Sequence, residues 1–314
     1  MLPEFVDALG EGLYAIDTGF VRPRFDAAYL IVDHGRAAFV DTGTNHAVPR
    51  LLAALHALGI GTHDVDWVIP THVHLDHAGG AGLLMRSLPR ARMAVHPRGQ
   101  RHMVDPSALV AGAIAVYGEQ EVARSYGMPV GVDAARTMVT ADGMTLTLGQ
   151  RTLEFIDTPG HARHHHCVWD ERTRTWFTGD TFGLAYPELA NERGRWVTPT
   201  SAPVQFDPEP LKASVARLLA REPAALCITH FGRVPNAPYL AALLASQIDE
   251  MAEIGQRLRH TEGRFARLCD ALRAMYGHRL AEHGFADLEP PLALMAADVA
   301  INAQGLEAWL DRTA

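Results

Sequence analysis

The stretch Thr71-His72-Val73-His74-Leu75-Asp76-His77 determines how the rest of the chain is interpreted, and we call these seven residues the nest. The nest follows the apolar residues 67–69, which indicate a strand that ends just before the histidines. Alternate residues of an extended segment point to the same side, so His72 and His74 can place two imidazoles together. The glycine-rich residues 78–82 let the backbone bend closely around an ion. Imidazole and carboxylate ligands suit zinc, iron or manganese.

Three further apolar runs also end in residues that bind metals. His161 closes the phrase Asp157-Thr158-Pro159-Gly160-His161, Asp180 follows Thr178-Gly179, and His230 follows the apolar residues 225–228 and Thr229. Catalytic sites are commonly built from loop residues that a rigid sheet positions. The recurrence predicts a metal centre assembled from four separate segments.

The run His72-x-His74-x-Asp76-His77 resembles the signature of the metallo-β-lactamase-fold hydrolases. The presence of His77 and Asp180 makes the chain similar to the branch that holds glyoxalase II, lactonases and thioesterases. The resemblance implies an α/β fold, namely an αββα two-sheet sandwich of the metallo-β-lactamase type. The regular leucine spacing beyond residue 236 adds a C-terminal helical extension.

The resemblance also implies a ligand set for two divalent ions, with zinc expected first and iron or manganese as alternatives. The ligands of the first ion would be His72, His74 and His161. The ligands of the second ion would be Asp76, His77 and His230. Asp180 would bridge the two ions, and Asp76 or Asp180 is the expected catalytic group that accepts or relays a proton.

The implied reaction is hydrolysis of an ester, thioester or lactone carbonyl by a hydroxide that bridges two metals, since metal binding lowers the pKa of water to roughly 7. Two alternatives share the fold. One is a mononuclear iron oxidoreductase similar to persulfide dioxygenases, and the other is a phosphodiesterase or nuclease. The net charge of −8 and a single lysine, Lys212, argue against a nucleic-acid partner.

Two further residues are candidates for supporting roles. His165 lies four residues after His161, where family members often carry a histidine that supports the site from behind the ligands. Tyr186 can donate a hydrogen bond to an oxyanion, or it can serve packing. The features that select a small-molecule substrate are expected in the insertion 97–133, in the loop 181–206 and in the C-terminal tail.

The sequence predicts a catalytic domain over residues 1–235 and a helical extension over 236–314. The helices either cover the mouth of the active site or form a homodimer interface. No secretory leader, membrane-spanning run or paired-cysteine pattern is recognised, so we expect a cytoplasmic protein without a membrane partner. The expected strands of the body cover residues 12–16, 28–32, 37–40, 67–69, 91–96, 144–148, 153–156, 166–169, 175–178 and 225–229. Helices are expected after Asn45, where a cap is predicted, after residue 82, within the insertion and from Pro208 to Arg221.

Overall fold

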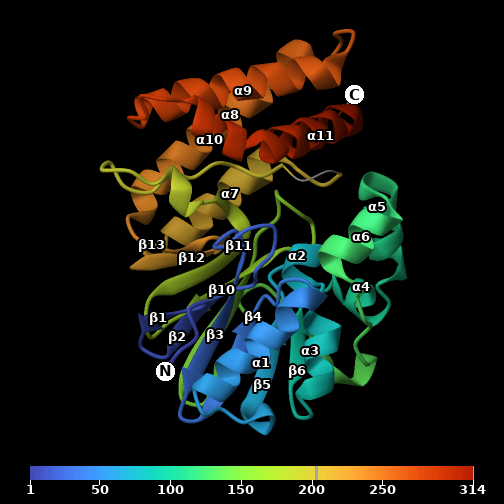
Figure 1. The fold of residues 1–314 in the computed structure, drawn as a ribbon, viewed down its shortest axis with the longest axis vertical. Coiled ribbons are helices and arrows are strands. Elements are labelled where there is room, and N and C mark those ends of the chain that lie inside the picture. Colours follow the sequence, from blue (N-terminus) through green and yellow to red (C-terminus); the bar gives the residue numbers. More distant parts are fainter. Residues whose placement is uncertain (202–203, 314) are drawn as a thin grey trace. The chain divides into compact units, whose positions relative to one another are not determined.

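The computed structural model describes residues 1–201 and 204–313, and over these residues the chain forms two β-sheets with helices (Figure 1). The loop 181–206 therefore includes two residues, 202 and 203, that lie outside the described residues. The fold class predicted from the sequence is confirmed as an α/β two-sheet sandwich with C-terminal helices.

The first sheet contains seven strands in chain order. They are β1 (Val6–Gly10), β2 (Leu13–Asp17), β3 (Ala27–Asp33), β4 (Arg36–Val40), β5 (Val65–Ile69), β6 (Arg92–Val95) and β7 (Thr137–Val139). Strands β1 to β4 pair antiparallel, and β4 to β7 pair parallel. His34 and Gly35 both have positive φ between β3 and β4, which is the backbone geometry of a tight hairpin turn. Strands β1 and β7 were not predicted, because β1 mixes acidic and apolar residues and β7 has only three residues.

The second sheet has the order β13-β12-β11-β10-β9-β8. Its strands are β8 (Thr145–Leu148), β9 (Arg151–Asp157), β10 (His166–Asp170), β11 (Thr175–Leu184), β12 (Ala225–His230) and β13 (Gly232–Val234). The predicted strands match β8 to β12, except that β11 continues six residues beyond the predicted end at 178. Asp180 is thereby a residue within β11 and does not follow its end.

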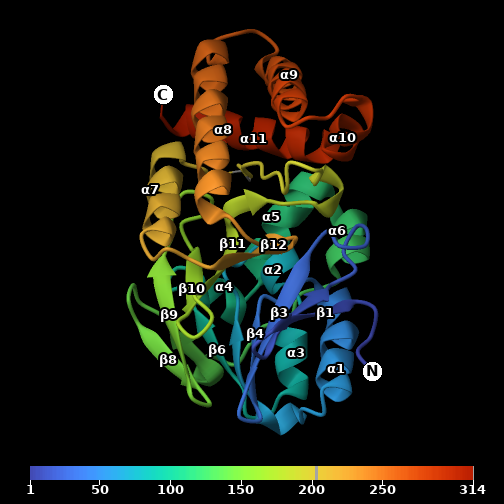
Figure 2. The same cartoon turned by 90° about the vertical axis from the view of Figure 1, so that its left-hand side faces the viewer.

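Two apolar cores follow from the alternation of side chains along β3. Ala28 and Leu30 belong to the outer core, which α1 (Val48–Ala57) and α3 (Ala81–Ser87) cover (Figure 2). Tyr29 and Ile31 belong to the inner core, which residues of both sheets share. Because both faces are covered, β3 is buried almost throughout, and the sheet provides a rigid base for the loops at its ends.

The predicted cap near Asn45 needs a correction. Asn45 opens a short 3₁₀ turn, η1 (Asn45–Ala47), in which the Thr44 hydroxyl accepts from the His46 amide at 3.3 Å. Helix α1 begins only at Val48, with Pro49 in its first turn. Proline favours this position because its missing N–H would have no partner inside the helix.

The remaining helices fall in the nest, in the insertion, in the segment between β11 and β12 and in the tail. They are α2 (Leu75–Ala78), α4 (Gln100–Val104), α5 (Ser107–Tyr117), α6 (Glu119–Tyr126), α7 (Pro208–Leu219), α8 (Ala237–Leu258), α9 (Arg264–Glu282), α10 (Glu289–Leu294) and α11 (Ala296–Arg312). Helices α8, α9 and α11 pack on one another. Within the described ranges, none of these helices is both long enough and apolar enough to cross a bilayer.

The contacts of the chain divide it into two compact units. Unit 1 comprises residues 1–157, 164–179 and 223–235, and unit 2 comprises 158–163, 180–222 and 236–314. Unit 2 includes all of the expected extension, which begins at residue 236. It also includes residues 158–163 and 180–222, which the sequence assigned to the catalytic domain. The predicted division into residues 1–235 and 236–314 stays a prediction.

Candidate metal centre

His72 and His74 face each other within unit 1, directly after β5. His72 Nε2 lies 2.9 Å from His74 Nδ1. The Thr71 hydroxyl lies 3.0 Å from both carboxylate oxygens of Asp41, so it donates to Asp41 and accepts from His72 Nδ1 at 3.2 Å. This tautomer leaves a lone pair on His72 Nε2, directed toward the ring of His74. Two imidazole nitrogens so close together suit a shared cation.

A second cluster in unit 1 contains Asp76, His77 and His230, whose ligand atoms all lie within 4.8 Å of one another. His77 donates from Nδ1 to Asp41 Oδ2 at 2.9 Å, and its Nε2 lies 3.8 Å from Asp76 Oδ2. His230 donates from Nδ1 to the Phe25 carbonyl at 3.1 Å, and its Nε2 lies 3.6 Å from the same Asp76 oxygen. Both histidines are buried.

Unit 2 holds His161 and Asp180 in the same kind of arrangement. His161 donates from Nδ1 to the Thr200 carbonyl at 3.1 Å, and its Nε2 lies 3.3 Å from Asp180 Oδ2. The turn before His161 packs closely against Leu211, since a Cβ on Gly160 would lie 2.3 Å from the backbone of that residue. Gly160 also has a φ of +130°, which favours glycine.

His77, His161 and His230 therefore share one pattern of hydrogen bonds. An oxygen acceptor holds each Nδ1–H, so Nε2 is the nitrogen with a lone pair, and a carboxylate stands beside it. Metal-binding histidines commonly have this support, because it fixes the tautomer and the orientation of the ring. The donor chemistry of these residues fits divalent ions of the zinc, iron and manganese type.

Asp41 is the residue that ties the segments of unit 1 together. It is fully buried and accepts from the Thr71 amide at 2.7 Å, from His77 Nδ1 and from the Thr229 hydroxyl at 2.9 Å. In the sequence, Asp41-Thr42-Gly43 resembles a structural turn that is common in metallo-β-lactamase-fold hydrolases, and Asp41 is not expected to be a metal ligand. The three residues are enough to predict the turn. The hydrogen bond between Asp41 and Thr229 joins residues 188 positions apart, so no local sequence pattern predicts it.

The consecutive histidines 164 to 166 lie in three different surroundings within unit 1. His165 is buried and stacks on His72 with ring centroids 4.8 Å apart, and a Cβ on Gly179 would lie 2.5 Å from its Nε2. His164 lies edge-on to His74 at 5.6 Å. His166 opens β10 as predicted, and it donates from Nε2 to the Pro70 carbonyl at 2.9 Å. The supporting role of His165 stays a prediction.

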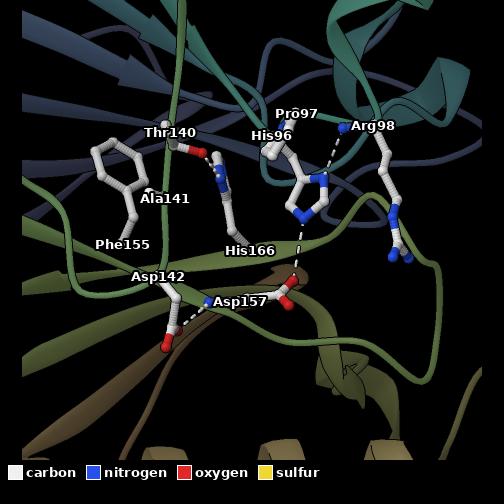
Figure 3. A pocket seen from close by; sticks show the side chains of 9 residues that line it. All are labelled: His96, Pro97, Arg98, Thr140, Ala141, Asp142, Phe155, Asp157 and His166. Carbon is white, nitrogen blue, oxygen red and sulfur yellow. Dashed lines mark hydrogen bonds and ion pairs between the residues drawn. The ribbon is translucent and has the colours of Figure 1, made fainter.

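A small cavity of about 190 Å³ lies beside His166 (Figure 3). Burial lowers the pKa of His166 to about 3, with a smaller contribution from His96, so its ring is neutral and accepts from the Thr140 hydroxyl at 2.9 Å. His96 accepts from the Arg98 amide at Nδ1 and donates from Nε2 to Asp157 at 3.0 Å. The hydrogen bonds of both rings therefore connect segments next to the nest and involve none of its residues.

The two remaining titratable groups of interest are Tyr186 and Asp26. The Tyr186 hydroxyl donates to Asp298 at 3.1 Å within unit 2, and the ring is buried, so its role toward an oxyanion stays a prediction. Burial raises the pKa of Asp26 to about 7, and His230 and His77 oppose this effect. Asp26 was not singled out from the sequence, because an acid before an apolar strand is common at loop ends.

The segments that carry these side chains lie within the range of one protein-family model. The family model of the metallo-beta-lactamase superfamily matches residues 21–230, which span the nest, His161, Asp180 and His230. The chain belongs to the metallo-beta-lactamase superfamily. This superfamily fold binds metals, and the chain carries a histidine-rich site within it.

Two members of the metallo-beta-lactamase superfamily are similar to the chain over most of its length. ST1585 of Sulfurisphaera tokodaii is 25% identical over 227 residues, which are 71% of this chain and 79% of that protein. Its solved structure matches with a TM-score of 0.65 at 20% identity and covers 95% of this chain and 98% of that chain. TTHA1429 of Thermus thermophilus matches with a TM-score of 0.66 at 21% identity, covering 98% of this chain and 95% of that chain.

Two further solved structures are less similar to the chain, and their names state two different activities. The Rm3 metallo-beta-lactamase has a TM-score of 0.56 at 16% identity, covering 79% of this chain and 93% of that chain. Rubredoxin oxygen:oxidoreductase of Desulfovibrio gigas has the same TM-score and identity, covering 81% of this chain and 68% of that chain. These likenesses show the fold alone, and hydrolases and oxidoreductases share it.

Proposed function

We propose that this protein is a dinuclear metal-dependent hydrolase that cleaves an ester, thioester or lactone carbonyl bond in a small molecule. The observation that carries the proposal is the repeated arrangement at His77, His161 and His230. Each Nδ1–H is held by an oxygen, and each Nε2 stands beside a carboxylate. Three such histidines on separate segments are hard to explain by packing alone.

In this proposal, His72, His74 and His161 hold one ion, Asp76, His77 and His230 hold the other, and Asp180 contributes to both. Divalent ions bound by such residues supply Lewis acidity and lower the pKa of water. Zinc is the first choice, and iron and manganese also suit the ligands. Asp76 and Asp180 are the carboxylates that accept a proton, and Asp41 holds His77 in the tautomer that the site needs.

The proposal is tested by elemental analysis of the purified protein together with a panel of thioesters, lactones and phosphodiesters. We expect two equivalents of metal and turnover of one carbonyl class. His74→Ala or Asp180→Ala should reduce turnover by at least about 10³-fold, because each removes a group that contacts the reaction centre. His63→Ala, at an exposed position in the 3₁₀ helix η2 (Thr62–Asp64), is the matched control and should leave both readouts unchanged.

Two results would contradict the proposal. One is unchanged turnover in either ligand variant. The other is a single equivalent of iron combined with oxygen consumption on a persulfide substrate, which would favour the mononuclear oxidoreductase. Cleavage of phosphodiesters alone would favour the nuclease.

A further inference from the structure

The cavity of about 190 Å³ beside His166 brings together rings and acids that are not among the candidate metal ligands (Figure 3). Its lining residues all belong to unit 1. In Figure 3 the rings of Phe155, His166 and His96 stand in a row, and the carboxylates of Asp142 and Asp157 lie below that row. The cavity therefore has an aromatic wall, formed by these three rings, and an acidic side, formed by these two carboxylates.

The aromatic wall is held firmly in place. The ring centroids of Phe155 and His166 lie 5.0 Å apart, and those of His166 and His96 lie 6.1 Å apart. Each of the three residues is at most 6% exposed, so the surrounding residues fix the position of the rings. The face of an aromatic ring carries partial negative charge and attracts a cation placed over it.

The two imidazoles of the aromatic wall are neutral, and none of their nitrogens is available to a metal ion. Nδ1 accepts in both rings, from the Arg98 amide in His96 and from the Thr140 hydroxyl in His166. Nε2 therefore carries the proton in both rings, and it donates to an oxygen in each case. A metal ion could bind here only by breaking these hydrogen bonds, because an imidazole binds a metal through a free lone pair.

The acidic side lies next to solvent. The side chain of Asp157, at the end of β9, is 47% exposed, and its Oδ1 accepts from His96 at 3.0 Å. The Asp157 amide donates to Asp142 Oδ1 at 2.9 Å, so the two acids are held side by side. Arg98 is the one cation of the lining, which therefore carries one more negative group than positive groups. This charge disfavours an anion, and covering two carboxylates with an uncharged apolar group is costly.

We propose that this cavity binds a small organic ammonium ion, with its alkyl groups against the aromatic wall and its charge beside Asp142 and Asp157. Aromatic rings recognise alkylated ammonium groups in this way, and the carboxylates add an attraction to the charge. A hydrated inorganic cation would make little use of the rings. The site is separate from the candidate metal centre, and the inference does not depend on the proposed hydrolysis.

The test measures binding of choline to the full chain, as purified, by ligand-observed NMR. The neutral analogue 3,3-dimethylbutan-1-ol has the same shape without the charge, and choline should bind about tenfold more tightly. Asp142→Asn keeps the size of the side chain and removes one charge, so it should weaken choline binding about fivefold. Asp105→Asn is the matched control, because Asp105 also accepts from a backbone amide, that of Ser107 at 3.0 Å, but does not line the cavity. It should bind choline as the wild type does.

A second variant examines the aromatic wall. Phe155→Leu keeps an apolar side chain but removes one ring, so it should weaken choline binding about threefold. Binding of the neutral analogue should change less, because it gains no attraction between a cation and the ring. Circular dichroism during thermal unfolding shows that each variant compared is folded.

Three results would overturn the proposal. They are equal binding of choline and its neutral analogue, equal choline affinity in the wild type and Asp142→Asn, and displacement of choline by zinc, which would place choline at the candidate metal centre. Vesicles of phosphatidylcholine distinguish two sources of the ammonium group. Cosedimentation that Asp142→Asn abolishes would support the site with a lipid headgroup as its ligand, and choline binding without cosedimentation would support it with a free ion.

Discussion

At the scale of single residues, Asp41 connects the sheet to the candidate metal centre. Its carboxylate accepts from Thr71, His77 and Thr229, which belong to three different segments. Asp41→Asn keeps the size of the side chain but places an amide N–H where a donor now points. We expect a 10- to 100-fold loss of metal affinity, on the order that is typical when the support of a ligand is removed. Competition with a chelator of known affinity measures this loss.

Thr229→Val is the matched control for Asp41. It removes one hydrogen bond to Asp41 but leaves the contact with His77 in place. The free energy of unfolding should fall by about 1 kcal/mol, and metal affinity should change by less than about threefold. If Asp41→Asn behaved like Thr229→Val in metal affinity, Asp41 would support the fold without orienting His77.

At the scale of elements, His166 attaches the start of β10 to the segment before the nest. Its ring is neutral, because burial lowers its pKa to about 3. The unfolded chain binds a proton below about pH 6.5 and the folded chain does not, so stability falls as the pH falls from about 6.5 toward 3. This group alone should cost about 2 kcal/mol between about pH 7 and pH 5.

Urea unfolding of the metal-free protein at about pH 7 and pH 5 measures this effect. His166→Gln should be less stable at neutral pH, because the ring donates to Pro70 and accepts from Thr140. Its decline on acidification should be smaller than that of the wild type by about 2 kcal/mol. His96 and Asp157 line the same cavity, and both are present in the wild type and in the variant. Equal declines would show that His166 titrates in the folded state.

The elements could be predicted from the sequence where their signal is local. A short continuous apolar run located β3, and helical leucine spacing located α8, because each pattern needs only neighbouring residues. The far end of β11 was missed, since its residues are buried by partners distant in sequence. The metal-binding phrases are local as well, whereas the acceptors that fix the tautomers, such as the carbonyls of Phe25 and Thr200, are backbone groups that any residue carries.

At the scale of the whole molecule, the segment that carries Asp180 folds with the tail. Asn302 of α11 accepts from the Ser201 amide at 2.6 Å and donates to the Pro199 carbonyl at 3.1 Å. Gln247 of α8 donates to the Val197 carbonyl at 2.7 Å. These buried side chains satisfy backbone groups of residues 197–201, which would lose their partners without the tail.

A chain that ends at Pro235 keeps every predicted metal ligand, so ligand identity alone predicts that it still binds metal. The contacts of unit 2 predict the opposite, because residues 180–222 lose the partners that α8 and α11 supply. We expect residues 1–235 to lose cooperative unfolding and to bind less than one equivalent of zinc. Circular dichroism during thermal unfolding and elemental analysis measure the two effects. The full chain with Arg273→Ala, which breaks an exposed ion pair in the tail, is the control and should match the wild type. A truncated chain that unfolds cooperatively and holds two equivalents would show that residues 1–235 form an independent domain.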